Sequence, residues 1–174
     1  MAEKNWFAMC CPLSGSDTLI LEYGDWKFDV DVEATKARTG KYSFDHCECG
    51  YCKNFYEVID HAHPQLRPAL EQFGIHLEGP CELVPFEPTL ILACYRVDGQ
   101  IVQWGKSSLY VSGAPLIPED GDEHTFLLWV GELPIPWIQE EAMEDVVSPA
   151  NLPEFMDRMR SLWELRHGNE FFFS

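Results

Sequence analysis

Apolar and charged residues alternate without a break in the segment Trp26-Lys27-Phe28-Asp29-Val30-Asp31-Val32-Glu33. Because successive side chains of a strand point to opposite faces of a sheet, the apolar residues are expected on a buried face and the charged ones on an exposed face. The segment therefore predicts a half-buried antiparallel strand with an acidic outer face.

Further strands are expected on both sides of this segment. Apolar runs bounded by turn residues predict them at residues 19–23, 82–86, 89–97, 100–104, 107–111 and 125–130. Asp98-Gly99 is a hairpin-turn signal, so residues 100–104 are expected to pair back onto 89–97. Residues 113–122 are acidic and contain prolines, which favours a loop.

Helical spacing is confined to a few segments. Phe55, Val58 and Ile59 form an apolar stripe in a helix expected from Cys52, and a second helix is expected from Pro64 to Phe73, before Gly74. A short helical turn is expected over residues 32–38, and a C-terminal helix over 151–167. Strands outnumber helices, which predicts an α+β fold: a mostly antiparallel sheet with two or three packed helices.

The length of 174 residues is typical of a single domain, and no composition shift marks a linker. We therefore expect one α+β domain over residues 1–174. It would have an irregular segment at 1–18, a strand-rich body at 19–147 that includes a cysteine loop and helices near 52–73, and the C-terminal helix.

The chain has 12 basic and 29 acidic residues, for a formal net charge of −17. This charge argues against binding to nucleic acid and to anionic membranes, and it is compatible with a basic protein partner. No apolar run approaches the ~20 residues that a membrane helix needs. The first residues lack the pattern of a secretory signal, so a cytoplasmic location is expected.

Three of the seven cysteines lie within six residues, in His46-Cys47-Glu48-Cys49-Gly50-Tyr51-Cys52. A C-x-x-C turn can deliver two thiolates to one zinc ion, and Cys47 would add a third. His46 is adjacent in sequence, and a fourth ligand could also come from His61, His63, Cys81 or Cys94. The spacing therefore predicts a structural zinc site formed by Cys47, Cys49 and Cys52, with His46 or His63 completing it.

Other interpretations of the cysteines remain open. Cys49 and Cys52 at a helix start are also typical of a redox pair, in which Cys49 attacks and Cys52 resolves. A cysteine nucleophile with a histidine base is another option. Cys81 and Cys94, in apolar strand contexts, are expected to be small buried hydrophobic residues.

The stretch Asp45 to Phe55, of the form C-x-C-x-x-C-[Lys/Arg]-Asn-aromatic, resembles a motif in a family of uncharacterised bacterial proteins. The segments Val32-Glu33-Ala34-Thr35-Lys36, Leu70-Glu71-Gln72-Phe73-Gly74-Ile75 and Pro80-Cys81-Glu82 are similar as well. This resemblance covers about residues 26–87. It implies a bacterial or phage cytosolic origin and no known activity.

The sequence contains no phosphate-binding glycine loop, serine-hydrolase elbow or zinc-protease motif. We therefore expect an acidic cytosolic protein-binding domain with a structural, zinc-binding cysteine loop. An immunity or inhibitor protein that acts on a basic partner is a concrete form of this hypothesis. The alternative is a thiol- or metal-dependent enzyme that uses Cys47, Cys49 and Cys52.

Overall fold

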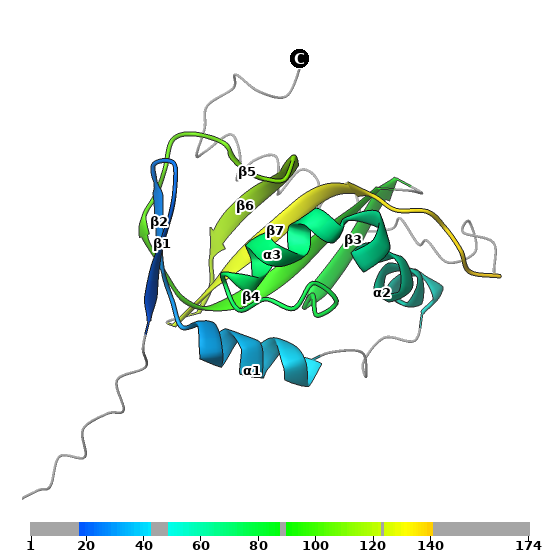
Figure 1. Ribbon diagram of the computed structural model, residues 1–174, viewed down its shortest axis with the longest axis horizontal. Helices are drawn as coiled ribbons and strands as arrows, with labels where there is room; N and C mark the ends of the chain where they lie inside the picture. The colour runs from blue at the N-terminus through cyan, green and yellow to red at the C-terminus, as the bar shows by residue number, and fades with distance from the viewer. Residues whose placement is uncertain (1–17, 43–48, 88–89, 123, 141–174) are drawn as a thin grey trace, which may run out of the picture.

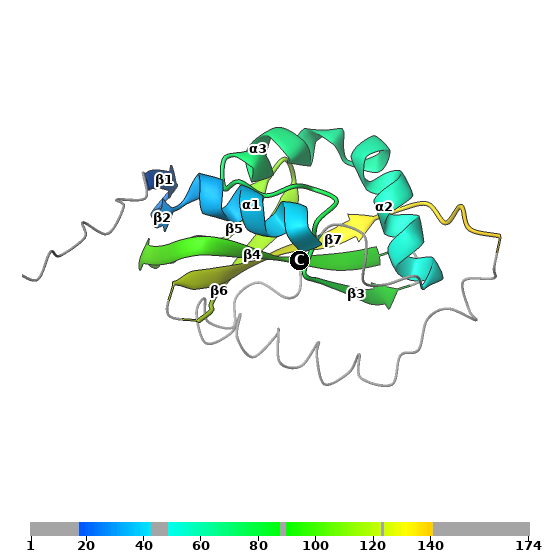
Figure 2. The same cartoon turned by 90° about the horizontal axis from the view of Figure 1, so that it is seen from below.

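The computed structural model describes residues 18–42, 49–87, 90–122 and 124–140. They form one antiparallel sheet with helices on one of its faces (Figures 1 and 2), which confirms the α+β class. The strands are β1 (Leu19–Tyr23), β2 (Trp26–Val30), β3 (Glu82–Glu87), β4 (Leu90–Gln103), β5 (Leu109–Val111), β6 (Ala114–Asp120) and β7 (Thr125–Pro134). The strand order is β1-β2-β4-β7-β6-β5, with β3 paired to β4.

The alternation in β2 has the predicted result. Trp26, Phe28 and Val30 are buried, whereas Lys27 and Asp29 are half-buried on the other face. The strand ends where Asp31 caps the next helix, because its Oδ1 accepts a hydrogen bond from the Ala34 amide at 2.9 Å. The predicted strand is therefore three residues too long at its C-terminal end.

β4 is one continuous strand of 14 residues, so the hairpin predicted at Asp98-Gly99 is wrong. Its first part pairs with β3 and β7, and the part after Asp98 pairs with β2. Gly99 has a φ of +145°, and a Cβ atom there would lie 2.1 Å from the Asp29 carbonyl oxygen. The glycine therefore permits a close approach of β2 and does not form a turn.

The acidic segment after Gly113 is strand β6, so the prediction of a loop at 113–122 is wrong for most of its length. A tight hairpin joins β5 to β6 through Ser112 and Gly113, both with positive φ. Among the described strands, β6 has only β7 as a neighbour beyond Leu116, and prolines are tolerated on such edges.

The helices are α1 (Val32–Tyr42), α2 (Gly50–Ala62), the 3₁₀ turn Pro64–Leu66 and α3 (Arg67–Glu71). Figure 2 shows them on the same face of the sheet. Gly74 follows α3 with a φ of +77°, as predicted for a helix stop, and a Cβ there would lie 2.3 Å from the Val32 carbonyl oxygen. α1 continues through Gly40, where the sequence predicted an end.

Aromatic rings join the helical layer to the sheet. The ring of Phe28 on β2 lies 5.5 Å from that of Phe73 and 5.4 Å from that of Phe126 on β7. All three side chains are almost completely buried. Burial of each such ring contributes about 2–3 kcal/mol, so this cluster is a major part of the core.

Two predicted segments lie outside the described residues: the irregular segment at 1–18, except for Thr18, and the helix at 151–167. Within the described part of the chain, no helix is long and apolar enough to cross a membrane.

Candidate functional site

Cys49 and Cys52 lie at the start of α2, as the sequence predicted. Cys49 is the N-cap residue, and its sulfur accepts a hydrogen bond from the Cys52 amide at 3.4 Å. Cys49 is exposed and Cys52 is partly exposed. Cys47 and His46, the other predicted zinc ligands of this loop, lie outside the described residues.

His63 lies at the opposite end of α2 from the two cysteines. Its Nε2 is 2.7 Å from the Pro134 carbonyl oxygen on β7. Along the helix axis it is roughly 16 Å from Cys52, at about 1.5 Å per residue. The structure therefore does not bring His63 to the cysteine pair, and the described residues contain no group of three or more His, Cys, Asp or Glu side chains arranged to hold a metal ion.

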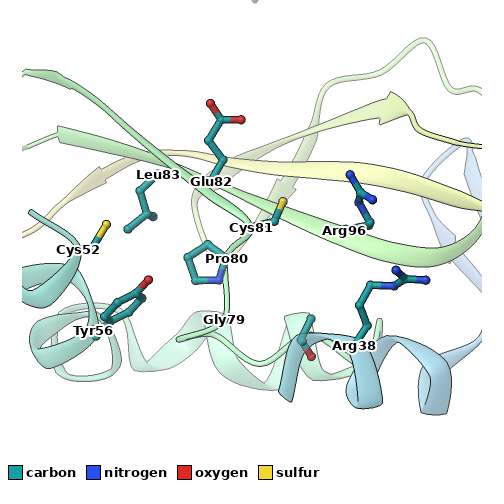
Figure 3. A pocket seen from close by; sticks show the side chains of 10 residues that line it. Arg38, Cys52, Tyr56, Gly79, Pro80, Cys81, Glu82, Leu83 and Arg96 are labelled. Atoms are coloured by element: carbon teal, nitrogen blue, oxygen red, sulfur yellow. The ribbon is translucent and has the colours of Figure 1, made fainter. Parts of the chain in front are cut away.

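A pocket of about 540 Å³ opens between α2, α1 and the edge of β4. It lies where β3 pairs with the first part of β4 and β2 pairs with the last part, and none of the described strands covers the edge between them. In Figure 3, Cys52 and Tyr56 from α2 lie at one end and the two arginines at the other, with Cys81 between them. The lining side chains with functional chemistry are Arg38, Cys52, Tyr56, Cys81, Glu82 and Arg96.

Cys81 and Cys94 form a thiol pair at this pocket. The Cys81 amide donates to the Cys94 carbonyl oxygen at 2.7 Å, and the sulfur of Cys81 lies 3.3 Å from the same oxygen. The two cysteines are thus in contact through the Cys94 backbone. Cys81 is exposed, contrary to the expectation of a buried hydrophobic residue, whereas Cys94 is buried as expected.

The surroundings of the two thiols shift their pKa values in opposite directions. The hydrogen bond from Cys94 lowers the pKa of Cys81, and the positive charge of Arg96 lowers it further, against the opposing effects of burial and of Glu82. The hydrogen bond to Cys81 raises the pKa of Cys94, and burial raises it further. Cys81 is thus the member of the pair that ionises first.

The two arginines of the pocket differ in how firmly they are held. Arg38 makes two hydrogen bonds to the Asp98 carboxylate, at 2.7 and 2.5 Å. Nη1 of Arg96 lies 3.5 Å from a carboxylate oxygen of Asp122, whose side chain is 83% exposed. Such a long, exposed ion pair contributes little stability, so the Arg96 guanidinium can turn toward another anion.

Sequence reasoning missed the pairing of Cys81 with Cys94, which are 13 residues apart. A signal for it existed in the predicted strands at 82–86 and 89–97. A hairpin centred on residues 87 and 88 between them places Cys81 opposite Cys94, one residue away from the register of the structure, in which Cys94 pairs with Glu82.

A second, acidic hollow of about 290 Å³ lies on the outer side of β2 and includes Asp29, Asp31, Asp98 and His124. Asp31 caps α1 and Asp98 is bound by Arg38. Oδ2 of Asp29 accepts a long hydrogen bond from Gln100 at 3.4 Å. The other oxygen, Oδ1, is buried, and none of the described residues donates a hydrogen bond to it.

The hollow follows from the alternation in the sequence, which places Asp29 on the outer face of β2. Ile20 on the edge strand β1 pairs with Asp29 in register, and Gln100 on β4 pairs with it on the other side. The side chain of Ile20 is 52% exposed, so an apolar surface adjoins the buried carboxylate.

Compared with protein-family models, with curated proteins and with solved structures, the chain has no match in any of the three.

Proposed function

We propose that this chain binds a basic protein partner and that the acidic hollow receives a lysine or arginine side chain of that partner. The observation that supports this most directly is the buried Oδ1 of Asp29, which none of the described side chains or amides satisfies. A buried acceptor without a donor costs about 1–3 kcal/mol, more when it is charged. An incoming ammonium or guanidinium group would supply the missing donor and a compensating charge.

The surroundings of Asp29 suit a protein interface. Ile20 on the edge strand pairs with Asp29 and is 52% exposed, so it would supply apolar contact that an interface needs beside its charged contacts. The net charge of −17 would accelerate the encounter with a basic protein, more strongly at low salt. An immunity or inhibitor protein that covers the basic surface of a toxin or nuclease is the form of this proposal that fits the charge.

The cysteine loop has a structural role in this proposal. Cys49 and Cys52 would be two ligands of a zinc ion, with Cys47 as a third and His46 beside them in sequence. The amide of Cys52 already donates to the Cys49 sulfur, which holds the two residues together in the turn that opens α2. The same contact favours the second candidate, a thiol- or metal-dependent enzyme that uses Cys47, Cys49 and Cys52.

Binding can be tested with a short peptide of lysines and arginines, followed by amide chemical shifts in ¹⁵N-labelled protein. Shifts are expected at Ala34, Gly99 and Gln100, which line the hollow. Asp29→Asn should abolish them, because it removes the charge and half of the acceptors at the centre of the hollow. The shifts should also weaken as salt is added.

The matched control is Glu71→Gln, which removes one charge from the exposed C-terminal end of α3. Equal loss of binding in both variants would show that only net charge attracts the peptide, and the hollow would then have no specific role. Shifts that spread evenly over the surface of the wild-type protein would overturn the proposal in the same way.

A further inference from the structure

We propose that Cys81 and Cys94 are a thiol–disulfide exchange pair, in which Cys81 attacks a small anionic disulfide in the adjoining pocket and Cys94 resolves the mixed disulfide. This activity is separate from the binding of a basic partner, and it uses neither the acidic hollow nor the cysteines of the predicted zinc loop. It rests on the contact of the Cys81 sulfur with the Cys94 carbonyl oxygen at 3.3 Å, and on the opposite accessibility of the two thiols, beside a pocket of about 540 Å³.

The two positions suit the two roles of such a pair. An attacking thiol has to be reached by its substrate, and Cys81 is exposed and lines the pocket. A resolving thiol has to be shielded from other reactants and close to the first sulfur. Cys94 is 1% exposed and packs beside Leu92 and Trp129, and its carbonyl oxygen lies 3.3 Å from the Cys81 sulfur.

The chemistry balances with a low-molecular-weight disulfide, RSSR, as the oxidant. The Cys81 thiolate attacks one sulfur of RSSR, forms Cys81–S–S–R and releases RS⁻, which takes a proton from water. Cys94 then attacks the Cys81 sulfur and forms the Cys81–Cys94 disulfide, and its proton goes to the second RS⁻. The protein loses two protons and two electrons, and RSSR becomes two RSH.

The order of the two steps follows from the electrostatics. While Cys81 is a thiolate, its hydrogen bond and its negative charge are among the causes that raise the pKa of Cys94 and keep that thiol protonated. Formation of the mixed disulfide removes both causes, since the Cys81 sulfur is then neutral. Cys94 is thus released for ionisation only after the first step has occurred.

The pocket favours a disulfide that carries carboxylates. Arg96 lies beside Cys81 and is only loosely held by Asp122, and Arg38 lies at the same end of the pocket (Figure 3). Glu82 also lines the pocket, and its negative charge would oppose the binding of an anionic disulfide. Comparing a dianionic disulfide with an uncharged one therefore measures the contribution of the arginines. Glutathione disulfide has several carboxylates and is the probe that we choose, with the uncharged hydroxyethyl disulfide as comparison.

The test exposes the reduced full-length chain to glutathione disulfide, quenches samples with an alkylating agent and maps them by mass spectrometry. Because Pro68 follows Arg67, trypsin leaves a peptide of residues 54–96 that contains Cys81 and Cys94 and no other cysteine. The expected course is a transient glutathione adduct on Cys81, followed by loss of two hydrogens as the internal disulfide forms. A peptide in which both thiols stay alkylatable would overturn the proposal.

Three cysteine variants and two charge variants separate the roles. Cys94→Ser and Cys94→Ala should both accumulate the adduct on Cys81, whereas Cys81→Ser should give neither adduct nor disulfide in this peptide. Arg96→Gln should slow the reaction with glutathione disulfide more than that with hydroxyethyl disulfide, and Lys36→Gln, which removes an exposed positive charge that does not line the pocket, should slow neither. An adduct on Cys94 in the Cys81→Ser protein, or equal effects of the two charge variants, would contradict the assigned roles.

Discussion

Arg38 on α1 and Asp98 on β4 form a bidentate ion pair. Nε of Arg38 donates to Oδ2 of Asp98 at 2.7 Å, and Nη2 donates to Oδ1 at 2.5 Å. The Asp98 amide also donates to the Thr35 hydroxyl of the same helix at 3.0 Å. These contacts fix α1 to β4 at the residue where its pairing with β7 ends and its pairing with β2, on the other edge, begins. The first helix is therefore held at the boundary between the acidic hollow and the cysteine pocket.

Arg38→Ala is expected to lower the free energy of unfolding by about 1–3 kcal/mol, between the values for exposed and buried ion pairs. The side chains of Arg38 and Asp98 are 33% and 14% exposed, so their attraction is only partly screened. Urea unfolding followed by circular dichroism measures the change. Lys36→Ala on the same helix breaks an exposed pair with Glu33 and should cost less than about 0.5 kcal/mol. Equal losses in both variants would contradict a special role for the Arg38–Asp98 pair.

Gly99→Ala should destabilise the protein more than Gly113→Ala does. Both glycines have positive φ, so each alanine would strain the backbone. At Gly99 the new Cβ would also lie 2.1 Å from the Asp29 carbonyl oxygen, whereas at Gly113 it would meet nothing within 4 Å. The difference between the two variants, expected to exceed about 1 kcal/mol, measures the clash between β4 and β2. Similar unfolding midpoints for both would show that the strands separate easily.

The Asp98-Gly99 pair also shows where sequence reasoning fails. Its turn signal is a local property, but the conformation of Gly99 is set by β2, which is about 70 residues away along the chain. The strand predicted at 26–33 and the helix predicted from Cys52 are present with shifted ends, because their alternation and apolar stripe are themselves local. The strand β6 was missed because its prolines suggested a loop.

The candidate sites also differ in how far local sequence reveals them. The C-x-x-C spacing of Cys49 and Cys52 is visible in the sequence, and its place at a helix start was predicted. The contact between Cys81 and Cys94 depends on the register of a hairpin, and the buried oxygen of Asp29 depends on packing of β1, β2 and β4. Neither property can be obtained from spacing alone.

Tyr95→Phe tests a buried hydrogen bond and predicts a change in alkaline stability. The Tyr95 hydroxyl donates to the Leu77 carbonyl oxygen at 2.7 Å, and the side chain is completely buried. Loss of this bond should cost about 1–2 kcal/mol at neutral pH. Burial raises the pKa of Tyr95 well above its ordinary value of 10.0, so the neutral form is favoured in the folded protein.

The sign of the pH effect follows from this shift. The stabilisation is fully present below about pH 10, where Tyr95 is neutral in both the folded and the unfolded chain. It is lost as the pH rises from there toward the pKa of the folded state, because the unfolded chain ionises first. Urea unfolding at pH 8 to 11, taken as approximate limits, should show a steeper decline for the wild type than for Tyr95→Phe. Parallel declines would show that Tyr95 is not the group responsible.

Zinc content tests the structural role proposed for the cysteine loop. Protein purified without a histidine tag is expected to contain about one zinc ion per chain by elemental analysis, and a chelator should lower its thermal stability. Cys52→Ser should lose the metal, whereas Cys94→Ser, which changes a thiol buried in the sheet, should retain it. Metal-free wild-type protein with one rapidly alkylated cysteine in residues 47–52 would contradict the zinc proposal and favour the thiol enzyme. Because Cys81 and Cys94 are mapped in a separate peptide, this result would leave their exchange reaction open to independent measurement.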